Sequence, residues 1–311
     1  MQHGISVIIP VYRSQGSVAL VIEKLLAILP TVTPAYEIIL VEDGSPDDSW
    51  SILKAQSETH PEVRALRFMR NFGQHNALLC GVIHARYDLC VTMDDDLQHP
   101  PDELPKLVAA LGNYDVVYGY PDEVQYSGLM RKIATYVTKR VLQEAMGKDN
   151  ARYIAPYRLF RTQLREAFKH YSGNYVNLDV LLTWGTSKFH HIPVHYQKRA
   201  IGTSNYTLSK LITHTVNLLV GFSTLPLRIA SLLGLALTGF GFLIMLYILV
   251  IRYFIFGTYE VPGFTFLASV ISIFAGSQLF ILGIMGEYIA RIYFRVMERP
   301  VFVVAEDSRP D

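Results

Sequence analysis

Cysteine is nearly absent from this chain, which has two in 311 residues. Cys80 and Cys90 show no metal-ligand or redox spacing, so a disulfide framework and a cysteine-based metal site are excluded. Both lie in apolar surroundings, and we predict two buried, reduced thiols. We also expect no signal peptide, because the short apolar run from Ile5 to Val11 has no basic leader and no cleavage site.

Charged residues make up only 18% of the chain, and two long stretches have none. No charged side chain occurs between Arg228 and Arg252, or between Glu260 and Glu287. Each stretch is longer than the roughly 20 residues that a helix needs to cross about 30 Å of hydrocarbon. The connection between them is too short to be a domain. The sequence therefore predicts a hairpin of two transmembrane helices.

Acidic residues are missing from Val180 to Tyr259, whereas basic residues flank the hairpin on both sides. They are Lys188, Lys198, Arg199, Lys210 and Arg228 before or at the first span, and Arg291, Arg295 and Arg299 after the second. The positive-inside rule places the long N-terminal region and the C-terminus in the cytoplasm. We therefore predict a multi-pass protein of the cytoplasmic (inner) membrane, and we expect no nucleic-acid partner.

Short β-favouring runs alternate with helical patterns in the first hundred residues. The expected strands are 5–12, 36–41, 63–68 and one that leads into Asp94, and the expected helices are 18–29, one through 50–53, 73–85 and one from about 101. This alternation indicates an α/β fold with a mostly parallel, Rossmann-like sheet covered on both faces. Ligands bind such sheets beyond the carboxyl ends of the strands. We expect Tyr12, Asp43, Arg70 and the carboxylates from Asp94 on to converge there.

Three adjacent carboxylates, Asp94, Asp95 and Asp96, follow the fourth expected strand, and two prolines stop the strand beyond them. Side chains alternate along an extended chain, so Asp94 and Asp96 are expected on one face and Asp95 on the other. Carboxylate oxygens suit Mg²⁺ or Mn²⁺. The pair Asp94 and Asp96 is therefore the candidate metal site. A solvated acidic turn is the alternative, and the convergence of motifs favours the metal.

Several motifs resemble, in order, those of the GT-A glycosyltransferases of family 2. They are IIPVY at 8–12, VEDGS at 41–45, RNFGQH at 70–75 and DDDLQHPP at 94–101. The later motifs GTSNY at 202–206, TLPLR at 224–228 and GEYIARIY at 286–293 are similar to those of polyprenyl-phosphate glycosyltransferases. The resemblance implies a GT-A catalytic domain, a nucleotide-sugar donor, Mg²⁺ or Mn²⁺, a polyprenyl (undecaprenyl) phosphate acceptor at the lipid bilayer, and a homo-oligomer.

The resemblance also assigns roles by matching position. It implies that Pro10, Tyr12, Asp43, Arg70, Asp94, Asp95 and Gln98 contact the nucleotide sugar. Asp94 and Asp96 would hold the metal and the donor diphosphate. Arg131, Arg199 and Ser204 are the candidates for the acceptor phosphate. Asp94, Asp96, Arg131 and Arg199 are thus the candidate catalytic residues, and His75 and His99 are expected to be hydrogen-bond partners within the site motifs.

Three departures from the family pattern bear on catalysis. Arg13 and Ser14 replace a family pair that ends in a carboxylate, and Asn205 replaces a lysine. Pro156 stands where the family often has an aspartate that acts as general base. A phosphate monoester is mostly dianionic at pH 7 and needs no base to become a nucleophile. We therefore expect catalysis to persist, with Asp149 and Asp122 as substitute bases if one is needed.

The expected domains are a cytoplasmic GT-A domain at 1–200, an interfacial region at 201–226, two transmembrane helices within 227–286 at about 228–252 and 263–286, and a juxtamembrane helix with a C-terminal strand or tail at 287–311. Amphipathic helices are expected at 126–146 and 206–223, and a short strand near 301–304 is expected to return to the catalytic domain. The predicted reaction is inverting transfer of one sugar, from a UDP-linked donor, for cell-envelope glycan or lipid modification. The alternative is a catalytically silent, membrane-anchored partner of another glycosyltransferase.

Overall fold

The computed structural model describes residues 2–122, 143, 153–173, 175–197, 220, 224–247 and 263–309. The chain divides into two compact units. The first consists of Met1–Thr215 together with Glu298–Asp311, and the second of Val216–Met297. The first unit therefore contains chain from before and after the predicted hairpin.

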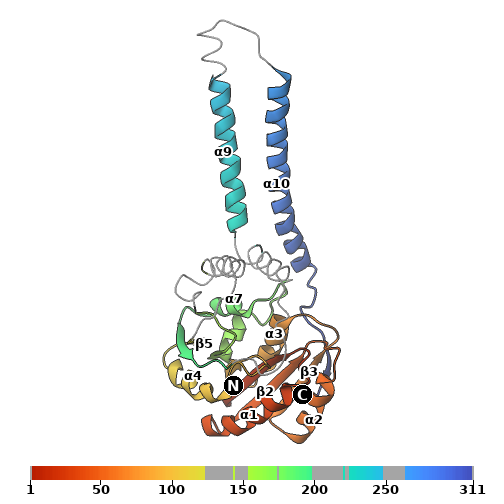
Figure 1. Ribbon diagram of the computed structural model, residues 1–311, viewed down its shortest axis with the longest axis vertical. Helices are drawn as coiled ribbons and strands as arrows, with labels where there is room; N and C mark the ends of the chain where they lie inside the picture. The colour runs from red at the N-terminus through yellow and green to blue at the C-terminus, as the bar shows by residue number, and fades with distance from the viewer. Residues whose placement is uncertain are drawn as a thin grey trace. The chain divides into compact units, whose positions relative to one another are not determined.

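A sheet forms the centre of the first unit (Figure 1). The described residues give it eight strands in the order β7-β5-β6-β4-β1-β2-β3-β8. The strands are β1 (Gln2–Val11), β2 (Tyr36–Glu42), β3 (Val63–Phe68), β4 (Tyr87–Thr92), β5 (Val116–Pro121), β6 (Arg158–Arg161), β7 (Phe189–Val194) and β8 (Val304–Asp307). Strands β4, β1, β2 and β3 are parallel neighbours, as are β5 and β7, whereas β6 and β8 run antiparallel to the strands beside them. The predicted mostly parallel, Rossmann-like sheet is confirmed.

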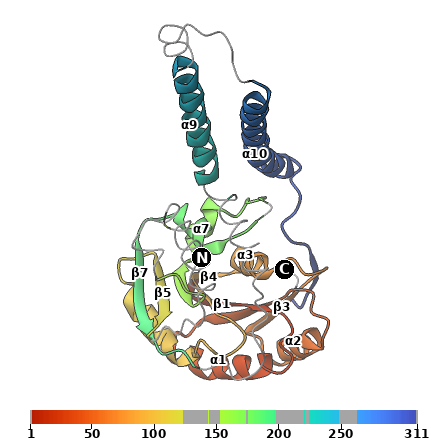
Figure 2. The ribbon, with the colours of Figure 1, turned by 45° about the horizontal axis from the view of Figure 1, so that its top comes forward.

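Helices cover both faces of this sheet (Figure 2). They are α1 (Val18–Val32), α2 (Ser49–Thr59), α3 (Gln74–His84), α4 (Leu104–Leu111) and α7 (Leu178–Thr183), with 3-10 turns η1 (Pro101–Glu103) and η2 (Thr162–Ala167). On β1, Val7, Ile9 and Val11 join the core that contains α1 and α4, whereas Ile8 faces α3. A Cβ added at Gly81 of α3 would lie 2.3 Å from Ile8 Cγ2, so only glycine permits this approach. Both cysteines are buried and free, as predicted, and burial raises the pKa of each thiol.

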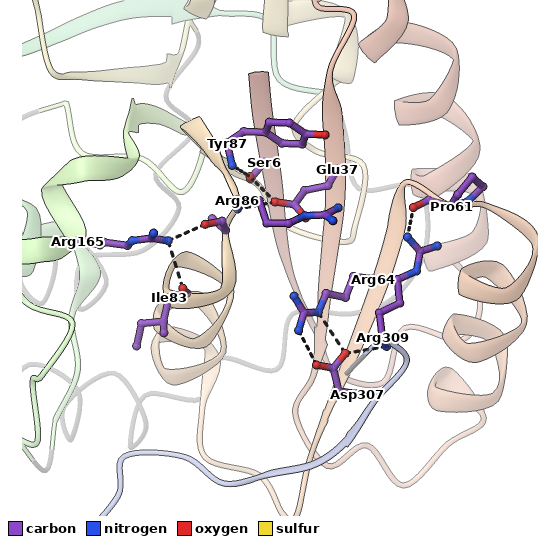
Figure 3. A network of polar contacts seen from close by, with 11 residues as sticks. Ser6, Glu37, Pro61, Arg64, Ile83, Arg86, Tyr87, Arg165, Asp307 and Arg309 are labelled. Carbon is purple, nitrogen blue, oxygen red and sulfur yellow. Dashed lines mark hydrogen bonds and ion pairs between the residues drawn. The ribbon is translucent and has the colours of Figure 1, made fainter. Parts of the chain in front are cut away.

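Buried polar contacts fix the first strands and α3 (Figure 3). Glu37 on β2 is fully buried and accepts hydrogen bonds from Ser6 Oγ at 2.6 Å, from the Arg86 backbone N–H at 2.7 Å and from Arg86 Nε at 2.8 Å. Arg165 donates to the carbonyl oxygens of Ile83 and Ala85 at 3.2 and 2.6 Å, where the C-terminal end of α3 favours a positive charge. The carboxylate therefore joins β1, β2 and the start of β4, and the guanidinium holds the end of α3.

The C-terminal strand β8 adds to the edge of the sheet beside β3. Arg64 donates to the Asp307 carboxylate from Nε at 3.1 Å and from Nη2 at 2.7 Å (Figure 3). Arg309 donates to backbone carbonyl oxygens that include those of Pro61 and His60. The prediction that a short strand returns to the catalytic domain after the hairpin is confirmed, with the strand a few residues later than expected.

Two long apolar helices, α9 (Leu225–Tyr247) and α10 (Phe264–Val296), make up most of the described part of the second unit. Pro226–Leu243 and Ile273–Val296 are long and apolar enough to cross a membrane, and only 6% and 0% of these segments are buried. Leu235, for example, is 71% exposed. The buried share of these two segments is far below that of a core helix in a soluble protein. Their exposed apolar side chains are suited to contact with lipid. The two predicted apolar helices are confirmed.

Candidate functional site

The end of β2 holds the loop that follows β3. Asp43 directly follows β2 and is 3% exposed. Its Oδ1 accepts the N–H of Phe72 at 2.6 Å and its Oδ2 accepts that of Gly73 at 2.8 Å, while Asn71 Nδ2 donates to its carbonyl oxygen at 3.1 Å. Burial raises the pKa of Asp43 to about 6, and these two N–H groups and the charge of Arg70 oppose the rise. Asp43 therefore fixes the loop 70–73 against the end of β2.

Gly44 makes this close approach of two loops feasible. Its φ is +63°, a left-handed conformation that glycine adopts at no steric cost. A Cβ at this position would lie 2.6 Å from the carbonyl carbon of Arg70 and 2.6 Å from the nitrogen of Asn71. Since both are backbone atoms, a side chain at residue 44 would have to displace the loop itself.

We expect Gly44→Ala to weaken binding of UDP, measured with Mn²⁺ by calorimetry, by at least about 10-fold, because the displaced loop carries Arg70 and holds Asp43. The unfolding free energy should fall by about 1–3 kcal/mol. Gly112→Ala is the matched control, since Gly112 also has a positive φ, of +41°, but a Cβ there meets nothing within 4 Å. The control should lose some stability and keep its affinity for UDP. Equal affinities in the two variants would contradict this account of Gly44.

The three carboxylates follow the end of β4, and two of them, Asp95 and Asp96, lie in a turn; we call residues 94–96 the acidic turn. Strand β4 ends at Thr92, and Leu97 has a positive φ of 62°. The premise that an extended chain places Asp94 and Asp96 on one face is therefore wrong, because Asp95 and Asp96 lie in a turn. Turn hydrogen bonds orient the side chains instead. Gln74 Nε2 donates to Asp94 Oδ1 at 2.8 Å, and the Gln98 N–H donates to Asp96 Oδ1 at 3.0 Å.

Asp95 points to the loop after β1. Ser14 Oγ donates to its Oδ2, and the backbone of Tyr12 also bonds to it. Burial raises the pKa of Asp95 to about 6, with a further contribution from the charges of Asp94 and Asp96, and the two hydrogen bonds oppose the rise. Asp95 thereby joins the β1 loop to the acidic turn.

His99 supports the acidic turn from within the protein. It is 2% exposed, and its Nδ1 accepts the backbone N–H of Asp94 at 3.1 Å. Burial lowers the pKa of His99 to about 4, so the imidazole is neutral at pH 7, as an accepting Nδ1 requires. His75 is also an acceptor, but for a different element: its Nδ1 accepts the backbone N–H of Leu178, the first residue of α7, at 3.3 Å. The prediction that both histidines are hydrogen-bond partners is confirmed.

The remaining candidates for the donor lie around this edge. Pro10 pairs with Val41 between β1 and β2, and Tyr12 is 40% exposed. The guanidinium carbon of Arg70 lies 4.2 Å from the centre of the Phe72 ring. Together with the contacts of Asp43 and Gln74, these positions form a connected arc from the end of β1 through the loop after β3 to the acidic turn. The expected convergence of the strand ends is therefore observed.

Pro156 lies beside the end of β4. Its carbonyl oxygen accepts a hydrogen bond from Thr92 Oγ1 at 2.9 Å, in the last residue of that strand. Two residues later, Arg158 is 3% exposed and forms an ion pair with Asp179. The position that the family often gives to a catalytic aspartate therefore adjoins the acidic turn, but here it offers a carbonyl group instead of a carboxylate.

Some candidates lie outside the described residues. They are Arg131, Arg199 and Ser204, the substitute base Asp149, and, apart from residues 143 and 220, the segments 126–146 and 206–223 that were expected to be amphipathic helices. The other substitute base, Asp122, follows β5, and its carboxylate lies 3.5 Å from Nδ1 of His195. The expected roles of these residues remain proposals.

Two residues that shape the site were missed at the sequence level. Ser14 was noted only for the carboxylate it replaces, yet it holds Asp95. Gln74 was noted only as part of a motif, yet it bonds to Asp94. Both are polar residues between the end of a strand and the body of the next helix, Ser14 in the loop after β1 and Gln74 as the first residue of α3. That position is a usable signal, although the partner of each side chain depends on a loop far away in the sequence.

Comparisons with known proteins agree with this geometry. The sequence model of glycosyl transferase family 2 matches residues 6–172, and the chain belongs to this family. The undecaprenyl-phosphate 4-deoxy-4-formamido-L-arabinose transferase of Sodalis glossinidius is 35% identical over 302 residues, which cover 96% of this chain and 92% of the relative. The enzyme of the same name from Enterobacter sp. strain 638 is 36% identical over 304 residues, covering 97% and 93%. The protein is thus a glycosyltransferase, and the similarity extends through the apolar helices.

Solved structures share the fold at low sequence identity. Glucosyl-3-phosphoglycerate synthase from Mycobacterium tuberculosis, in complex with Mn²⁺, uridine-diphosphate-glucose and phosphoglyceric acid, has a TM-score of 0.53 at 17% identity and covers 70% of this chain and 78% of its own. Mannosyl-3-phosphoglycerate synthase from Rubrobacter xylanophilus has a TM-score of 0.50 at 15% identity, covering 68% and 70%. At these identities the likeness extends to the GT-A fold.

Proposed function

We propose that this membrane glycosyltransferase moves one sugar from a UDP-linked donor to undecaprenyl or another polyprenyl phosphate, with inversion at the anomeric carbon. The observation that carries the proposal is full-length similarity, at 35–36% identity, to relatives named for transfer of 4-deoxy-4-formamido-L-arabinose to undecaprenyl phosphate. That sugar is accordingly the first donor to test.

The donor is proposed to bind along the arc of strand ends. Asp43, Pro10, Tyr12 and Arg70 would contact the nucleotide, and Asp95 and Gln98 would support its diphosphate end. Hydrogen bonds to Asp43 and Asp95 favour the carboxylate and oppose the burial that raises the pKa of each to about 6. The loop 70–73 can therefore hold a fixed position while the base and ribose bind.

Asp94 and Asp96 are the proposed residues for Mg²⁺ or Mn²⁺. The described residues contain no group of three or more His, Cys, Asp or Glu side chains that would hold a metal by themselves. Two carboxylates fit this finding, because Mg²⁺-type ions are often held by one or two carboxylates together with substrate phosphates and water. Such an ion neutralises charge on the leaving diphosphate. The chain's contribution is to fix both carboxylates through Gln74, Gln98 and His99.

The acceptor phosphate is proposed to bind Arg131, Arg199 and Ser204. A polyprenyl phosphate is mostly dianionic at pH 7, so its oxygen attacks the anomeric carbon without prior loss of a proton. Positioning then replaces general-base catalysis, which is consistent with the proline at residue 156. A catalytically silent partner is not favoured, because the acidic turn and its supporting hydrogen bonds are intact.

The proposed orientation places the catalytic unit and both chain ends in the cytoplasm, at the inner membrane. The sheet contains strands from before the two apolar helices and β8 from after them. If each helix crosses the bilayer once, the two connections to this sheet leave the membrane on the same side. The basic residues around the hairpin make that side the cytoplasm. A homo-oligomer remains the expected assembly.

The decisive experiment is transfer of radiolabelled sugar from a panel of nucleotide sugars, led by the UDP-linked formamido-arabinose, to undecaprenyl phosphate. The full-length protein would be assayed in phospholipid vesicles with Mn²⁺, with Mg²⁺ and with chelator. Labelled lipid should appear only with a divalent cation. If the protein binds UDP in the presence of the metal but labels no lipid from any donor, the silent-partner alternative replaces this proposal.

A further inference from the structure

Three phenylalanine rings connect the segment after α10 to the loop 70–73, which we call the donor loop because it carries Arg70 and bonds to Asp43. Phe302, just before β8, stacks on Phe68 at the end of β3, with ring centres 5.3 Å apart and planes within 11°. Phe68 meets Phe72 edge to face, with ring centres 5.5 Å apart and an interplanar angle of 81°. Both arrangements are favourable for aromatic pairs. We call this set, Phe302, Phe68 and Phe72, the aromatic relay.

The aromatic relay ends at Phe72, in the loop whose N–H groups bond to the Asp43 carboxylate. The N–H of Phe72 donates to Asp43 Oδ1, and the Arg70 guanidinium lies over the Phe72 ring. A backbone hydrogen bond runs beside the rings, from the N–H of Met69 to the carbonyl oxygen of Val303 at 3.0 Å. The same two segments also border one pocket of about 400 Å³. The C-terminal segment thus forms part of the wall around the donor loop.

A separate set of contacts anchors this segment. The bidentate ion pair between Arg64 and Asp307 and the contacts of Arg309 hold β8 farther along the chain (Figure 3). They involve the start of β3 and the end of α2, and not the donor loop. Attachment of the strand and contact with the loop can therefore be perturbed separately.

We propose that Phe302 is a positioning residue for the nucleotide-sugar donor, acting through Phe68 and Phe72 to hold the loop 70–73 against Asp43. The proposal rests on the proposed donor site. It assigns a role in donor binding to chain that follows the second apolar helix. Donor affinity then depends on docking of the C-terminal segment, in addition to the residues that touch the nucleotide.

The first test needs no ligand. Amide hydrogen exchange of the full-length protein would be followed in the peptide that contains the N–H groups of Phe72 and Gly73, both bonded to Asp43. Phe302→Ala should raise exchange in this peptide, and Phe302→Tyr, which keeps the ring, should restore it. Val303→Ala is the matched control, because the Val303 side chain is 42% exposed and its hydrogen bond to Met69 uses the backbone. Unchanged exchange in Phe302→Ala overturns the proposal.

The second test measures donor binding. Phe302→Ala should raise the Kd for UDP with Mn²⁺ by roughly 3- to 10-fold, the factor that loss of one aromatic contact corresponds to. The KM for undecaprenyl phosphate should stay the same. Asp307→Asn, which weakens the anchor, should lower the melting temperature and leave the Kd near the wild-type value. If both variants raise the Kd equally, Phe302 acts only through the stability of the strand and the proposal fails.

The pH dependence gives a third readout. Asp43 faces Glu42, Arg70 and the two loop N–H groups, and its pKa is about 6. Wild-type affinity for UDP should fall as the pH drops through this value. Loosening the N–H bonds removes two contacts that favour the carboxylate, so the midpoint in Phe302→Ala should lie at higher pH. An unshifted midpoint counts against the proposal.

A loss of UDP affinity at low pH cannot be explained by unfolding of the protein when Asp43 is protonated. Its folded pKa is raised above the ordinary value of 3.8. The folded state therefore binds this proton more tightly than the unfolded state, and the group's contribution to stability increases as the pH falls from about 6 toward 4. Failure of wild type to bind UDP at any pH would refute the proposed function, whereas the exchange measurement tests the relay independently of it.

Discussion

Asp96→Ala is expected to reduce sugar transfer to undecaprenyl phosphate by at least about 10²–10³-fold, the effect of removing one preorganised group that stabilises developing charge. Asp96 is proposed to share a divalent cation with Asp94, and its Oδ1 is held by the Gln98 N–H. Loss of this carboxylate leaves the leaving diphosphate without a fixed cation. The measurement is the initial rate with labelled donor over a series of Mn²⁺ concentrations, together with the Kd for UDP at each.

Asp102→Ala is the matched control, because Asp102 is an exposed carboxylate only a few residues farther along. Its removal should change neither the rate nor the metal dependence by more than about twofold, since an exposed carboxylate contributes little. A second expectation concerns the fold: Asp96→Ala should retain the wild-type melting temperature. A variant that transfers sugar at a wild-type rate with the wild-type metal dependence would remove Asp96 from the metal site.

Arg158→Met should lower the free energy of unfolding by about 3–5 kcal/mol, because it leaves Asp179 as a buried charge without its cation. Arg158 on β6 and Asp179 on α7 are 3% and 6% exposed. Apart from Arg158, the Asp179 carboxylate accepts a hydrogen bond from Tyr118 Oη at 3.1 Å. One hydroxyl donor does not replace a guanidinium in this environment. Thermal and denaturant unfolding of the first unit within the full chain would measure the loss.

Arg161→Met is the matched control for this prediction. Arg161 lies three residues along on the same strand, and its pair with Asp115 has side chains that are 38% and 26% exposed. Exposed pairs of this kind contribute less than about 1 kcal/mol. The double variant Arg158→Met with Asp179→Leu should recover most of the lost stability, since no charge stays buried. Equal losses in Arg158→Met and Arg161→Met would show that the buried charge is not the cause.

The alternation of strands and helices in the first hundred residues could be predicted from local patterns. The apolar runs that became β1, β2 and β3 are bounded by proline, glycine and aspartate, and helical spacing follows each of them. A parallel sheet brings its strand ends to one edge, so the position of Asp43, Arg70 and the acidic turn followed from sequence alone. The family motifs added the expected chemistry of nucleotide-sugar and metal binding, because one motif stands at the end of each successive strand along the chain.

The orientation of individual side chains could not be predicted in the same way. Alternation along a strand was extended to Asp96, but β4 ends at Thr92, where the turn takes over. The side chains of that turn are then placed by Gln74, by His99 and by Ser14. Gln74 begins α3 and Ser14 lies in the loop after β1, and nothing in the local pattern around residues 94–96 indicates that either will be near, whereas His99 belongs to the same segment of the chain.

By itself, the sequence determined the class of fold, the two apolar helices and the residue types that collect where the parallel strands end. Those properties depend on periodicity, length and composition, which are local. The tertiary structure alone decided that Asp43 holds the loop 70–73, that β8 pairs with β3, and that Phe302 reaches Phe72 through Phe68. Each of these contacts joins segments that are far apart in the chain. Their formation depends on which surfaces become buried together, and that is fixed only when the whole unit has folded.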